Sequence, residues 1–483
     1  MYQNKKARQM KSYDIAIVGA GPAGMQAAIT ASANGASVVV IHDKPAAGGQ
    51  IYRNVSNSPL PDIAVLGKDY SKGESLVDEF NRCDAEVIFN ASVWHVGDDG
   101  EVLYSVDNQT QSLQAKEIIA ATGAMERPFP VKGWHLPGVM SAGSAQVMLK
   151  SDGLVKDDAV FVGSGPLLYV IVAQYLRLSV KVKAVVDTTE KASYLKAATK
   201  AADSFAQPAM VAKGLTLLNE IRRSGIPFYR FAEDLQIRGK EKAESISFRQ
   251  GQKQHEIECE HLFLHQGVIP NLNLTRALGL EHKWCEQQLC WHPVLDKWGQ
   301  SSVSNISVAG DGSAIVGADG AEYSGIVTAA NLLHRLGKIS KSSRDSMAGE
   351  PRRTLEKLNR FRRFIDELYR PSEQHRVPQA DDIVVCRCEE RTVADLKIGF
   401  QQGAVEPNAL KGITRCGMGP CQGRQCGHTV SELLAKWQNK PVAEIGYYRL
   451  RSPMRLLTLE ELSHFQHKEP NSQPLSQEAD HEA

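Results

Sequence analysis

The stretch Tyr13-Asp-Ile-Ala-Ile-Val-Gly-Ala-Gly-Pro-Ala-Gly24 determines the fold of the first part of the chain. Its apolar, β-branched run from Ile15 to Val18 predicts a buried parallel strand, because both faces of such a strand are covered. The glycines that follow, Gly19, Gly21 and Gly24, have GxGxxG spacing. An alanine-rich helix and a second apolar strand come next, so these elements form one βαβ unit.

The βαβ unit predicts a dinucleotide-binding site. Gly19 permits the tight turn, Gly21 lets the backbone approach a pyrophosphate, and Gly24 lets the helix pack closely on the strand. The helix N-terminus faces the phosphates with free N–H groups. The predicted pyrophosphate-binding residues are Gly19, Gly21, Pro22, Ala23 and Gly24. Asp43, after the second strand, is the predicted partner of the ribose hydroxyls, with His42 or a backbone group as the alternative.

A second unit of the same kind begins near residue 158. Its loop has Gly163 and Gly165 but carries Leu168 at the third glycine position. A side chain there pushes the helix away from the strand and displaces the nucleotide site. We therefore predict a second dinucleotide-type domain that has lost its nucleotide, and a working NAD(P) site is the alternative.

Composition excludes several functional classes. The chain has 483 residues, 42% hydrophobic and 23% charged, which is typical of a globular protein of several domains. A formal net charge of +1 provides no global field for attracting nucleic acid or an anionic membrane. No apolar run is long enough to span a bilayer, and no apolar stretch follows the basic N-terminus as in a secretory signal. We expect a cytoplasmic protein with no nucleic-acid partner and no transmembrane segment.

Five of the nine cysteines lie between Cys386 and Cys426. Such clustering in a long chain predicts a metal site in a reducing compartment rather than a disulfide scaffold. Two close groups of thiolates suit a tetrahedral zinc ion or a [2Fe–2S] cluster. The C-x-C spacing fits a zinc knuckle poorly, and Gly417 and Gly419 leave N–H groups free to bond cluster sulfurs. We favour the [2Fe–2S] cluster, with zinc or vestigial cysteines as alternatives.

Three further motifs resemble those of the two-dinucleotide-binding-domain flavoproteins, the relatives of glutathione and thioredoxin reductases. These motifs are Ala47-Gly-Gly-Gln-Ile-Tyr-Arg53, Ala120-Ala-Thr-Gly123 and Gly310-Asp311. The resemblance covers about residues 12–340 and implies FAD at the first site, with Asp311 beside the ribityl chain and pyrophosphate. The other FAD contacts in these motifs are Gly49, Gln50, Thr122, Gly123 and Gly310. No pair of redox cysteines accompanies the motifs, so disulfide reduction is excluded.

The cysteine-rich segment resembles the [2Fe–2S] domain of the bacterioferritin-associated-ferredoxin type (BFD-like). That family uses a C-x-C pair and a later close pair of cysteines. The resemblance implies that the cluster ligands are Cys386, Cys388, Cys416 and Cys421. The second pair has four intervening residues instead of two, so Cys426 is an alternative ligand, although its spacing favours a packed helical position.

Longer phrases resemble a bacterial family of amine-oxidising complexes over about residues 12–460. They are GGQIYR, ATGAMERPFPVKGWHLPGVM, GSGPLL and TRCGMGPCQGRQCG. The family includes subunits of opine oxidase, hydrogen cyanide synthase, and proline and hydroxyproline dehydrogenases, and a more distant relative is the alpha subunit of sarcosine oxidase. The resemblance implies an FAD- and [2Fe–2S]-containing electron-transfer subunit of an enzyme that oxidises the C–N bond of an amino acid, imino acid or opine. It also implies an amino-acid-oxidase-like flavoprotein partner that holds the substrate, a small ferredoxin-like subunit, and contact with the inner membrane only through the complex.

The predicted fold class is α/β, with two Rossmann-like domains and a small α-rich, BFD-like C-terminal domain. The FAD-binding domain is predicted over 12–128 and 286–345, and the degenerate Rossmann-like domain over 129–285. A charged connector helix is predicted over 346–382, the iron–sulfur domain over 383–460, and a tail over 461–483.

Catalytic residues stay unassigned, because no set of Arg with Tyr or His in the sequence can be placed around an amino-acid carboxylate. His135, beside Trp134, is more simply a structural residue than a base next to the flavin. Two other functions stay open. One is a self-sufficient NAD(P)H-dependent flavin and iron–sulfur reductase, and the other is a non-catalytic scaffold subunit.

Overall fold

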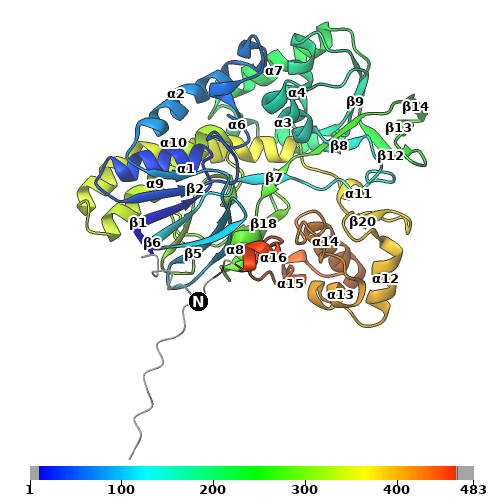
Figure 1. Ribbon diagram of the computed structural model, residues 1–483. Helices are drawn as coiled ribbons and strands as arrows, with labels where there is room; N and C mark the ends of the chain where they lie inside the picture. The colour runs from blue at the N-terminus through cyan, green and yellow to red at the C-terminus, as the bar shows by residue number, and fades with distance from the viewer. Residues whose placement is uncertain (1–9, 464, 466–483) are drawn as a thin grey trace, which may run out of the picture.

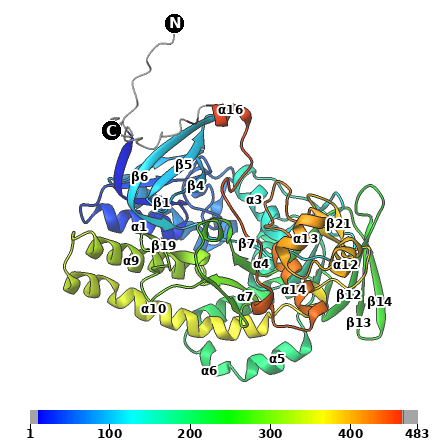
Figure 2. The same ribbon diagram turned by 90° about the horizontal axis from the view of Figure 1, so that it is seen from below.

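The structure, a computed structural model, describes residues 10–463 and residue 465. Figures 1 and 2 show two α/β parts joined along one long helix, with a small helical part beside them. The predicted α/β class and the two Rossmann-like sheets are confirmed. The last part of the predicted tail, residues 466–483, lies outside the described residues.

The first sheet has the strand order β3-β2-β1-β6-β5-β4, with β19 paired to β6. β1 runs parallel to β2 and β6, so Ile15 lies beside Val38 and Val18 beside Ala120. The apolar run of β1 is buried, as its pattern predicts. The strands are β1 (Lys11–Val18), β2 (Val38–Ile41), β3 (Glu86–Ile88), β4 (Ser92–Val96), β5 (Glu101–Val106), β6 (Gln109–Ala120) and β19 (Ile306–Val308).

Helices α1 (Pro22–Ser32) and α9 (Ala318–Arg335) pack against each other beside this sheet. Their backbones approach closely at Gly325, where a Cβ atom would stand 2.3 Å from the carbonyl oxygen of Ala23. Helix α2 (Lys68–Arg82) packs next to α1. A segment beyond residue 300 therefore completes the layer that the N-terminal segment begins.

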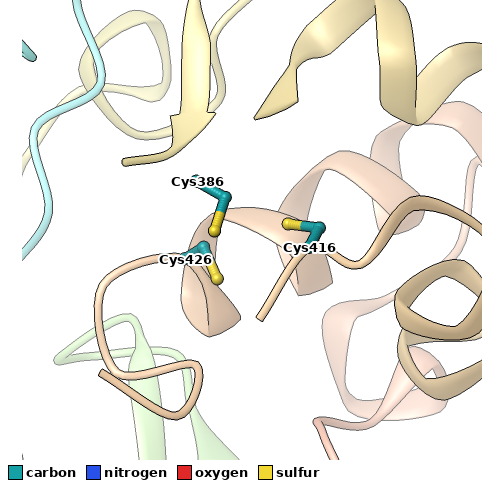
Figure 3. A group of neighbouring side chains, drawn as sticks. All are labelled: Cys386, Cys416 and Cys426. Carbon is teal, nitrogen blue, oxygen red and sulfur yellow. The ribbon is translucent and has the colours of Figure 1, made fainter. Parts of the chain in front are cut away.

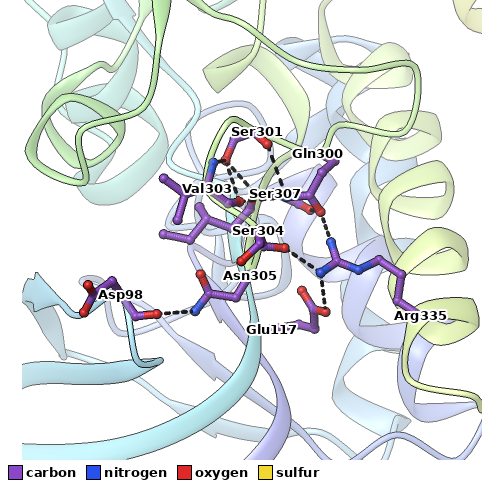
Figure 4. A network of polar contacts seen from close by, with 10 residues as sticks. Asp98, Glu117, Gln300, Ser301, Val303, Ser304, Asn305, Ser307 and Arg335 are labelled. Atoms are coloured by element: carbon purple, nitrogen blue, oxygen red, sulfur yellow. Dashed lines mark hydrogen bonds and ion pairs between the residues drawn. The ribbon is translucent and has the colours of Figure 1, made fainter.

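A polar network fixes the end of α9 to the first sheet (Figure 4). The guanidinium of Arg335 forms an ion pair of 3.0 Å with Glu117 on β6 and donates to Gln300 and to the carbonyl of Ser304. Burial raises the pKa of Glu117. Asn305 Nδ2 donates to the carbonyl of Asp98 at 3.1 Å. The network ties the strand that precedes Asp311 to the rest of the sheet.

The second sheet has the strand order β11-β10-β9-β15-β8, and every pairing in it is parallel. Its strands are β8 (Val139–Ser141), β9 (Ala159–Ser164), β10 (Val182–Asp187), β11 (Phe228–Arg230) and β15 (Leu262–Gln266). Its helices are α3 (Ala142–Asp152), α4 (Pro166–Arg177), α5 (Lys191–Ala198), α6 (Ala201–Ser204) and α7 (Pro208–Arg223). An antiparallel sheet of β12 (Ala232–Arg238), β13 (Ser245–Gln250) and β14 (Lys253–Glu258) extends from this part.

A two-stranded ribbon connects the two α/β parts. It consists of β7 (Ala124–Glu126) and β16 (Val268–Pro270), with Glu126 opposite Val268. Helix α8 (Asn273–Ala277) and the hairpin of β17 (His282–Cys285) and β18 (Cys290–Pro293) follow this ribbon. The chain then returns to the first sheet.

The charged segment after residue 340 forms the long helix α10 (Lys341–Leu368). Leu358 and Phe361 are among its buried residues. The helix packs on α9 and reaches α5 and α6, where Arg363 makes two hydrogen bonds of 2.9 Å with Asp203. In Figure 2 the helix runs along both α/β parts, so its contacts hold the two parts together.

The C-terminal part has its own apolar core, which includes Val385, Leu396, Leu410, Val430 and Leu433. A capping box at Thr392 and Asp395 begins α12. The elements are α11 (Glu373–Arg376), β20 (Val384–Cys386), β21 (Arg391–Thr392), α12 (Val393–Gln401), α13 (Pro407–Thr414), α14 (Gly427–Gln438), α15 (Val442–Ile445) and α16 (Leu459–Ser463). Among the described residues, no helix combines the length and the apolar character that crossing a membrane requires.

Candidate functional site

One large cavity, of about 1640 Å³, lies where the three parts of the molecule meet. The first-sheet side of its wall contains the glycine loop, and the second-sheet side contains α3 and α4. The cysteine-rich side contributes Arg387, Cys421, Arg424 and Gln425. The cavity is therefore lined by groups from all three parts.

The glycine loop presents open backbone to the cavity at Gly21, which lies immediately before α1. A Cβ atom on Gly21 would meet only the Cα of Gly49, at 3.7 Å, and the backbone of Gly21 has an ordinary extended conformation. Gly24 differs, because its Cβ would stand 1.9 Å from the carbonyl oxygen of Gly19. Gly24 is thus needed for packing, whereas Gly21 keeps space free for a ligand.

The structure brings nearly all the predicted dinucleotide-binding residues to this cavity. Gly24 does not line the wall. The predicted residues that line it are Gly19, Gly21, Pro22, Ala23, Asp43, Gly49, Gln50, Thr122, Gly123, Gly310 and Asp311. They come from segments up to residue 311 in the chain and meet at the ends of β1, β2, β6 and β19.

Both candidates for the ribose partner line the cavity. His42 is buried, and its Nδ1 accepts a hydrogen bond of 3.3 Å from the backbone N–H of Ala20. Burial lowers the pKa of His42, so the neutral ring is favoured. The Asp43 side chain is 54% exposed and lies next to Lys44. Asp43 therefore keeps its carboxylate available, while His42 already supports the loop.

Asp311 shapes the opposite end of the dinucleotide site. Its Oδ1 accepts the backbone N–H groups of Val316 and Gly317, at 2.8 and 2.9 Å. Burial raises the pKa of Asp311. The carboxyl group thus holds the turn that leads into α9, and the same residue lines the cavity.

The second glycine loop has no comparable opening. A Cβ on Gly163 would stand 1.8 Å from the carbonyl oxygen of His265, and a Cβ on Gly165 would meet the His265 ring at 3.4 Å. Leu168 is fully buried in the core. Neither glycine of this loop lines the large cavity. The third-position leucine and the His265 side chain occupy the space around this loop.

Sequence reasoning missed a buried acid–imidazole pair at the junction of the two α/β parts. Glu126 Oε1 lies 2.7 Å from His265 Nδ1, and Glu126 Oε2 accepts the N–H of Gly143 in the first turn of α3 at 2.8 Å. Glu126 lines the cavity. No local pattern marks this pair, because its members are 139 residues apart. His135, in contrast, is exposed and is not part of the wall.

Three buried sulfur atoms form a compact group in the C-terminal part (Figure 3). They belong to Cys386, Cys416 and Cys426, and all lie within 4.8 Å of one another. Hydrogen bonds from the thiols of Cys416 and Cys426 lower the pKa of Cys386 to about 2. The hydroxyl of Tyr448 donates to Cys416 Sγ at 3.5 Å. Such a set of thiols can be the larger part of a site for a soft metal ion or cluster.

The other two predicted ligands lie beside this group but are less enclosed. Cys388 is exposed and Cys421 is half-buried. Burial, with a contribution from the neighbouring Cys421 thiol, raises the pKa of Cys388. Cys426, which its spacing assigns to packing, joins Cys386 and Cys416 because it caps the N-terminus of α14 and lies next to them. The structure thus offers five neighbouring sulfurs, and the four-residue ligand set stays a prediction.

Trp134 connects the cavity to the strand that carries Cys386. Its indole N–H donates to the carbonyl of Val384 at 2.6 Å, and the guanidinium of Arg387 lies 5.2 Å from its ring. Trp134, Arg387 and Cys421 all line the cavity. One wall of the cavity is therefore built on the chain segments that hold the sulfur group.

Known proteins share this organisation over nearly the whole chain. The model of the pyridine nucleotide-disulphide oxidoreductase family matches residues 13–331, and that of the sarcosine oxidase A3 domain matches residues 384–464. An opine oxidase subunit of Agrobacterium tumefaciens is 38% identical over 465 residues, which cover 94% of this chain and 92% of that protein. The HcnB subunit of hydrogen cyanide synthase from Pseudomonas aeruginosa is 30% identical over 452 residues, which cover 91% of this chain and 96% of that protein.

Among solved structures, L-proline dehydrogenase from P. horikoshii has a similar fold. The TM-score is 0.68, and the match covers 95% of this chain and 82% of that chain at 19% sequence identity. The likeness includes the C-terminal part, so the arrangement of all three parts recurs in a known fold.

Proposed function

Since the chain belongs to the pyridine nucleotide-disulphide oxidoreductase family and, within it, to the group of these opine oxidase subunits, we propose that it is a flavin-dependent subunit of an enzyme that oxidises C–N bonds. Its substrate is an amino acid, an imino acid or an opine. The chain carries FAD and a [2Fe–2S] cluster and passes electrons from one to the other. The relatives are named as subunits, which supports a complex with further chains.

A single observation carries the proposal: the same cavity is lined by the glycine loop and by Cys421. A dinucleotide on the glycine loop and a cluster on the cysteines would therefore lie on one internal space. Electron transfer between two centres requires that they lie close together. A shared internal cavity would meet this requirement without a path through bulk solvent. Trp134 and Arg387 line the same cavity.

The residues of the first site fit FAD. The open face of Gly21 and the N-terminus of α1 suit the pyrophosphate, and Asp43 offers an exposed carboxylate to the adenosine ribose. Gly49, Gln50, Thr122 and Asp311 would surround the rest of the cofactor. When bound, FAD would supply a redox-active ring that takes up the electrons released by C–N oxidation on the partner and passes them on.

For the cluster we retain Cys386, Cys388, Cys416 and Cys421 as the proposed ligands. Cys386 and Cys416 belong to the buried sulfur group, and Cys388 and Cys421 form the neighbouring pair. Cys426 is the fifth sulfur within reach. A [2Fe–2S] cluster needs four thiolates, so the set is sufficient. The Tyr448 hydroxyl, as a donor to sulfur, would help to set the reduction potential.

We propose that the amine is bound by an amino-acid-oxidase-like flavoprotein partner, and that a small ferredoxin-like subunit completes the complex. The crowded second glycine loop, with Leu168 and His265, favours this over a self-sufficient NAD(P)H-dependent reductase. The large cavity on the glycine loop disfavours a non-catalytic scaffold. We place the complex in the cytoplasm or at the inner membrane, and its electron acceptor is left unassigned.

The function is tested by purifying the chain with its native partners and measuring dye reduction with a panel of amino acids, imino acids and opines. We expect flavin absorbance in the purified complex and reduction with one class of C–N substrate. A complex that reduces dye only with NAD(P)H would contradict the proposal and favour the reductase.

Replacing Gly21 by valine is expected to lower FAD content to about a tenth of wild type or less, because the side chain fills the space of the pyrophosphate. The surrounding protein has room for the Cβ, so folding should be kept. The measurement is flavin released per chain, with circular dichroism to monitor folding. Gly214→Val is a matched control, because Gly214 also has open space around its Cβ but does not line the cavity. Full FAD content in Gly21→Val would show that the pyrophosphate lies elsewhere.

A further inference from the structure

Two cationic side chains line the cavity wall beside the loop that follows Gly49. Lys150, in the last turn of α3, is only 2% exposed, and its Nζ donates to the carbonyls of Ile51 and Gln50, at 2.8 and 3.3 Å. Arg53 donates to the side chain of Gln50 at 3.0 Å, and its buried Nε has no hydrogen-bond partner. Among the described residues, neither cation forms an ion pair with a carboxylate.

This pair is electrostatically unbalanced. Burial of an ammonium group without a counter-charge is costly, and a second cation nearby adds repulsion. Burial, together with the charge of Arg53, lowers the pKa of Lys150 to about 7. An anion placed between the two cations would relieve both effects. A buried lysine beside a half-buried arginine, neither paired with a carboxylate among the described residues, is thus the pattern of a binding site for an anionic ligand.

Neighbouring side chains give the pair a fixed setting. The ring of Tyr70 lies 5.2 Å from Lys150 Nζ, and the Tyr70 hydroxyl donates to the carbonyl of Arg53 at 2.7 Å. Gln174, on α4, donates to the carbonyl of Leu66 at 2.9 Å. These side chains line the cavity, and we call Arg53, Tyr70, Lys150 and Gln174 the cationic lobe.

The cationic lobe is separate from the sulfur group. Its side chains come from α2, α3, α4 and the loop after Gly49. In Figure 1, α2 and α4 lie at the opposite end of the molecule from α12, α13 and α14. The proposed position of the pyrophosphate is also a different one, at the open backbone of Gly21. The lobe therefore adjoins the proposed FAD site at Gln50, but its own four side chains are not among the proposed FAD contacts.

We propose that the cationic lobe binds a small oxyanion, either the carboxylate of an amino-acid derivative or a phosphate group, between Arg53 and Lys150. The guanidinium of Arg53 offers the oxyanion planar paired donors, and the ammonium of Lys150 offers a point charge. The proposal goes beyond the proposed function, in which the amine is oxidised on a partner. It places on this chain itself a site for an anion, independent of the cysteines.

The test uses the full-length, FAD-loaded chain and two probes, N-acetylglycine for the carboxylate and inorganic phosphate. Binding is measured by calorimetry and by the change in flavin absorbance at about pH 6, where Lys150 is protonated. We expect saturable binding of one probe or both, weakened about tenfold or more by Lys150→Met and by Arg53→Met. The probe that binds identifies the source of the anion. No saturable binding of either probe would overturn the proposal.

Lys213→Met is the matched control, because Lys213 lines the same cavity but is paired with Asp69. We expect this variant to bind the probe as wild type does. Equal weakening of probe binding in Lys213→Met would show that the overall positive potential of the cavity attracts the anion, and not a specific site. That result would overturn the proposal. Loss of FAD from both Lys150→Met and Arg53→Met would also overturn it, because the cations would then belong to the FAD site.

The pH dependence of probe binding is a second test, in which the charge of Lys150 changes without a substitution. Lys150 is protonated below its pKa of about 7, so the affinity for N-acetylglycine, whose carboxylate stays ionised, should be constant there and fall above it toward the affinity of Lys150→Met. Inorganic phosphate changes its own charge in this range, so its profile is compared with that of Lys150→Arg. Tyr70, whose ring faces Lys150, stays neutral in this range because burial raises its pKa to about 12, and Arg53 supplies the neighbouring positive charge. In Lys150→Arg we expect N-acetylglycine binding that is independent of pH up to about 9. An unchanged pH profile in this variant would contradict the role of Lys150.

Discussion

Replacing Cys386 by alanine is expected to remove the metal centre completely while FAD remains bound. Cys386 belongs both to the proposed ligand set and to the buried sulfur group with Cys416 and Cys426. A cluster held by four thiolates does not survive the loss of a central one. The cysteine-rich part has an apolar core separate from that of the glycine loop, so the flavin site should stay intact. Iron analysis, visible absorption and released flavin measure the two effects independently.

Cys83→Ala is the control for this prediction, because Cys83 lies outside the sulfur group and is half-buried. It should retain iron and FAD at wild-type levels. Cys426→Ala separates the two ligand sets: retained iron supports the proposed four, and lost iron assigns Cys426 as a ligand. Zinc without iron in anaerobically prepared wild-type protein would contradict the [2Fe–2S] cluster.

The second large effect concerns the division of labour between subunits. We expect the isolated chain to contain FAD and iron but to turn over neither NAD(P)H nor amines at a significant rate. The second glycine loop is crowded by His265 and Leu168, and the substrate is proposed to bind to the partner. Adding an amino-acid-oxidase-like flavoprotein partner should raise amine-to-dye turnover into the ordinary enzymatic range, about 1–1000 per second.

A complex assembled with Cys386→Ala is the matched control for this reconstitution. It should bind the partner but lose most of the dye reduction, because the path through the cysteines is interrupted. An isolated chain that oxidises an amine within the ordinary range would place the catalytic pocket in this chain. In that case the cavity near Glu126 and His265 would be the first place to look for it.

Features that depend on the spacing of residues within a short stretch could be predicted from the sequence. The strand, glycine loop and helix around Gly21 follow from a periodic pattern over a short stretch, and the structure has each of them. The C-x-C pair predicted a metal site by spacing, and the structure places Cys386 in the buried group of three sulfurs, while the metal and its ligand set stay a prediction. Leu168 is buried in the core, and the loss of the nucleotide from the second loop stays a prediction.

Features that depend on residues far apart in the sequence coming together in the fold could not be predicted from local spacing. Cys426 was assigned to packing by helical spacing, but its position as the cap of α14 brings its sulfur to Cys386. The pairs Glu126–His265 and Arg53–Lys150 join different elements, and their sequence spacing has no period. The cavity itself depends on how three parts pack together, which composition and periodicity do not determine.

The central claim is that electrons from a C–N bond leave the flavin through the cysteine centre of the same chain. The most direct test is rapid mixing of the anaerobic reconstituted complex with its amine, followed by flavin absorbance and electron paramagnetic resonance of frozen samples. We predict that the signal of a reduced [2Fe–2S] cluster rises as flavin absorbance falls, and that Cys386→Ala abolishes the signal. Full turnover to the acceptor with a cluster that never becomes reduced would contradict the claim.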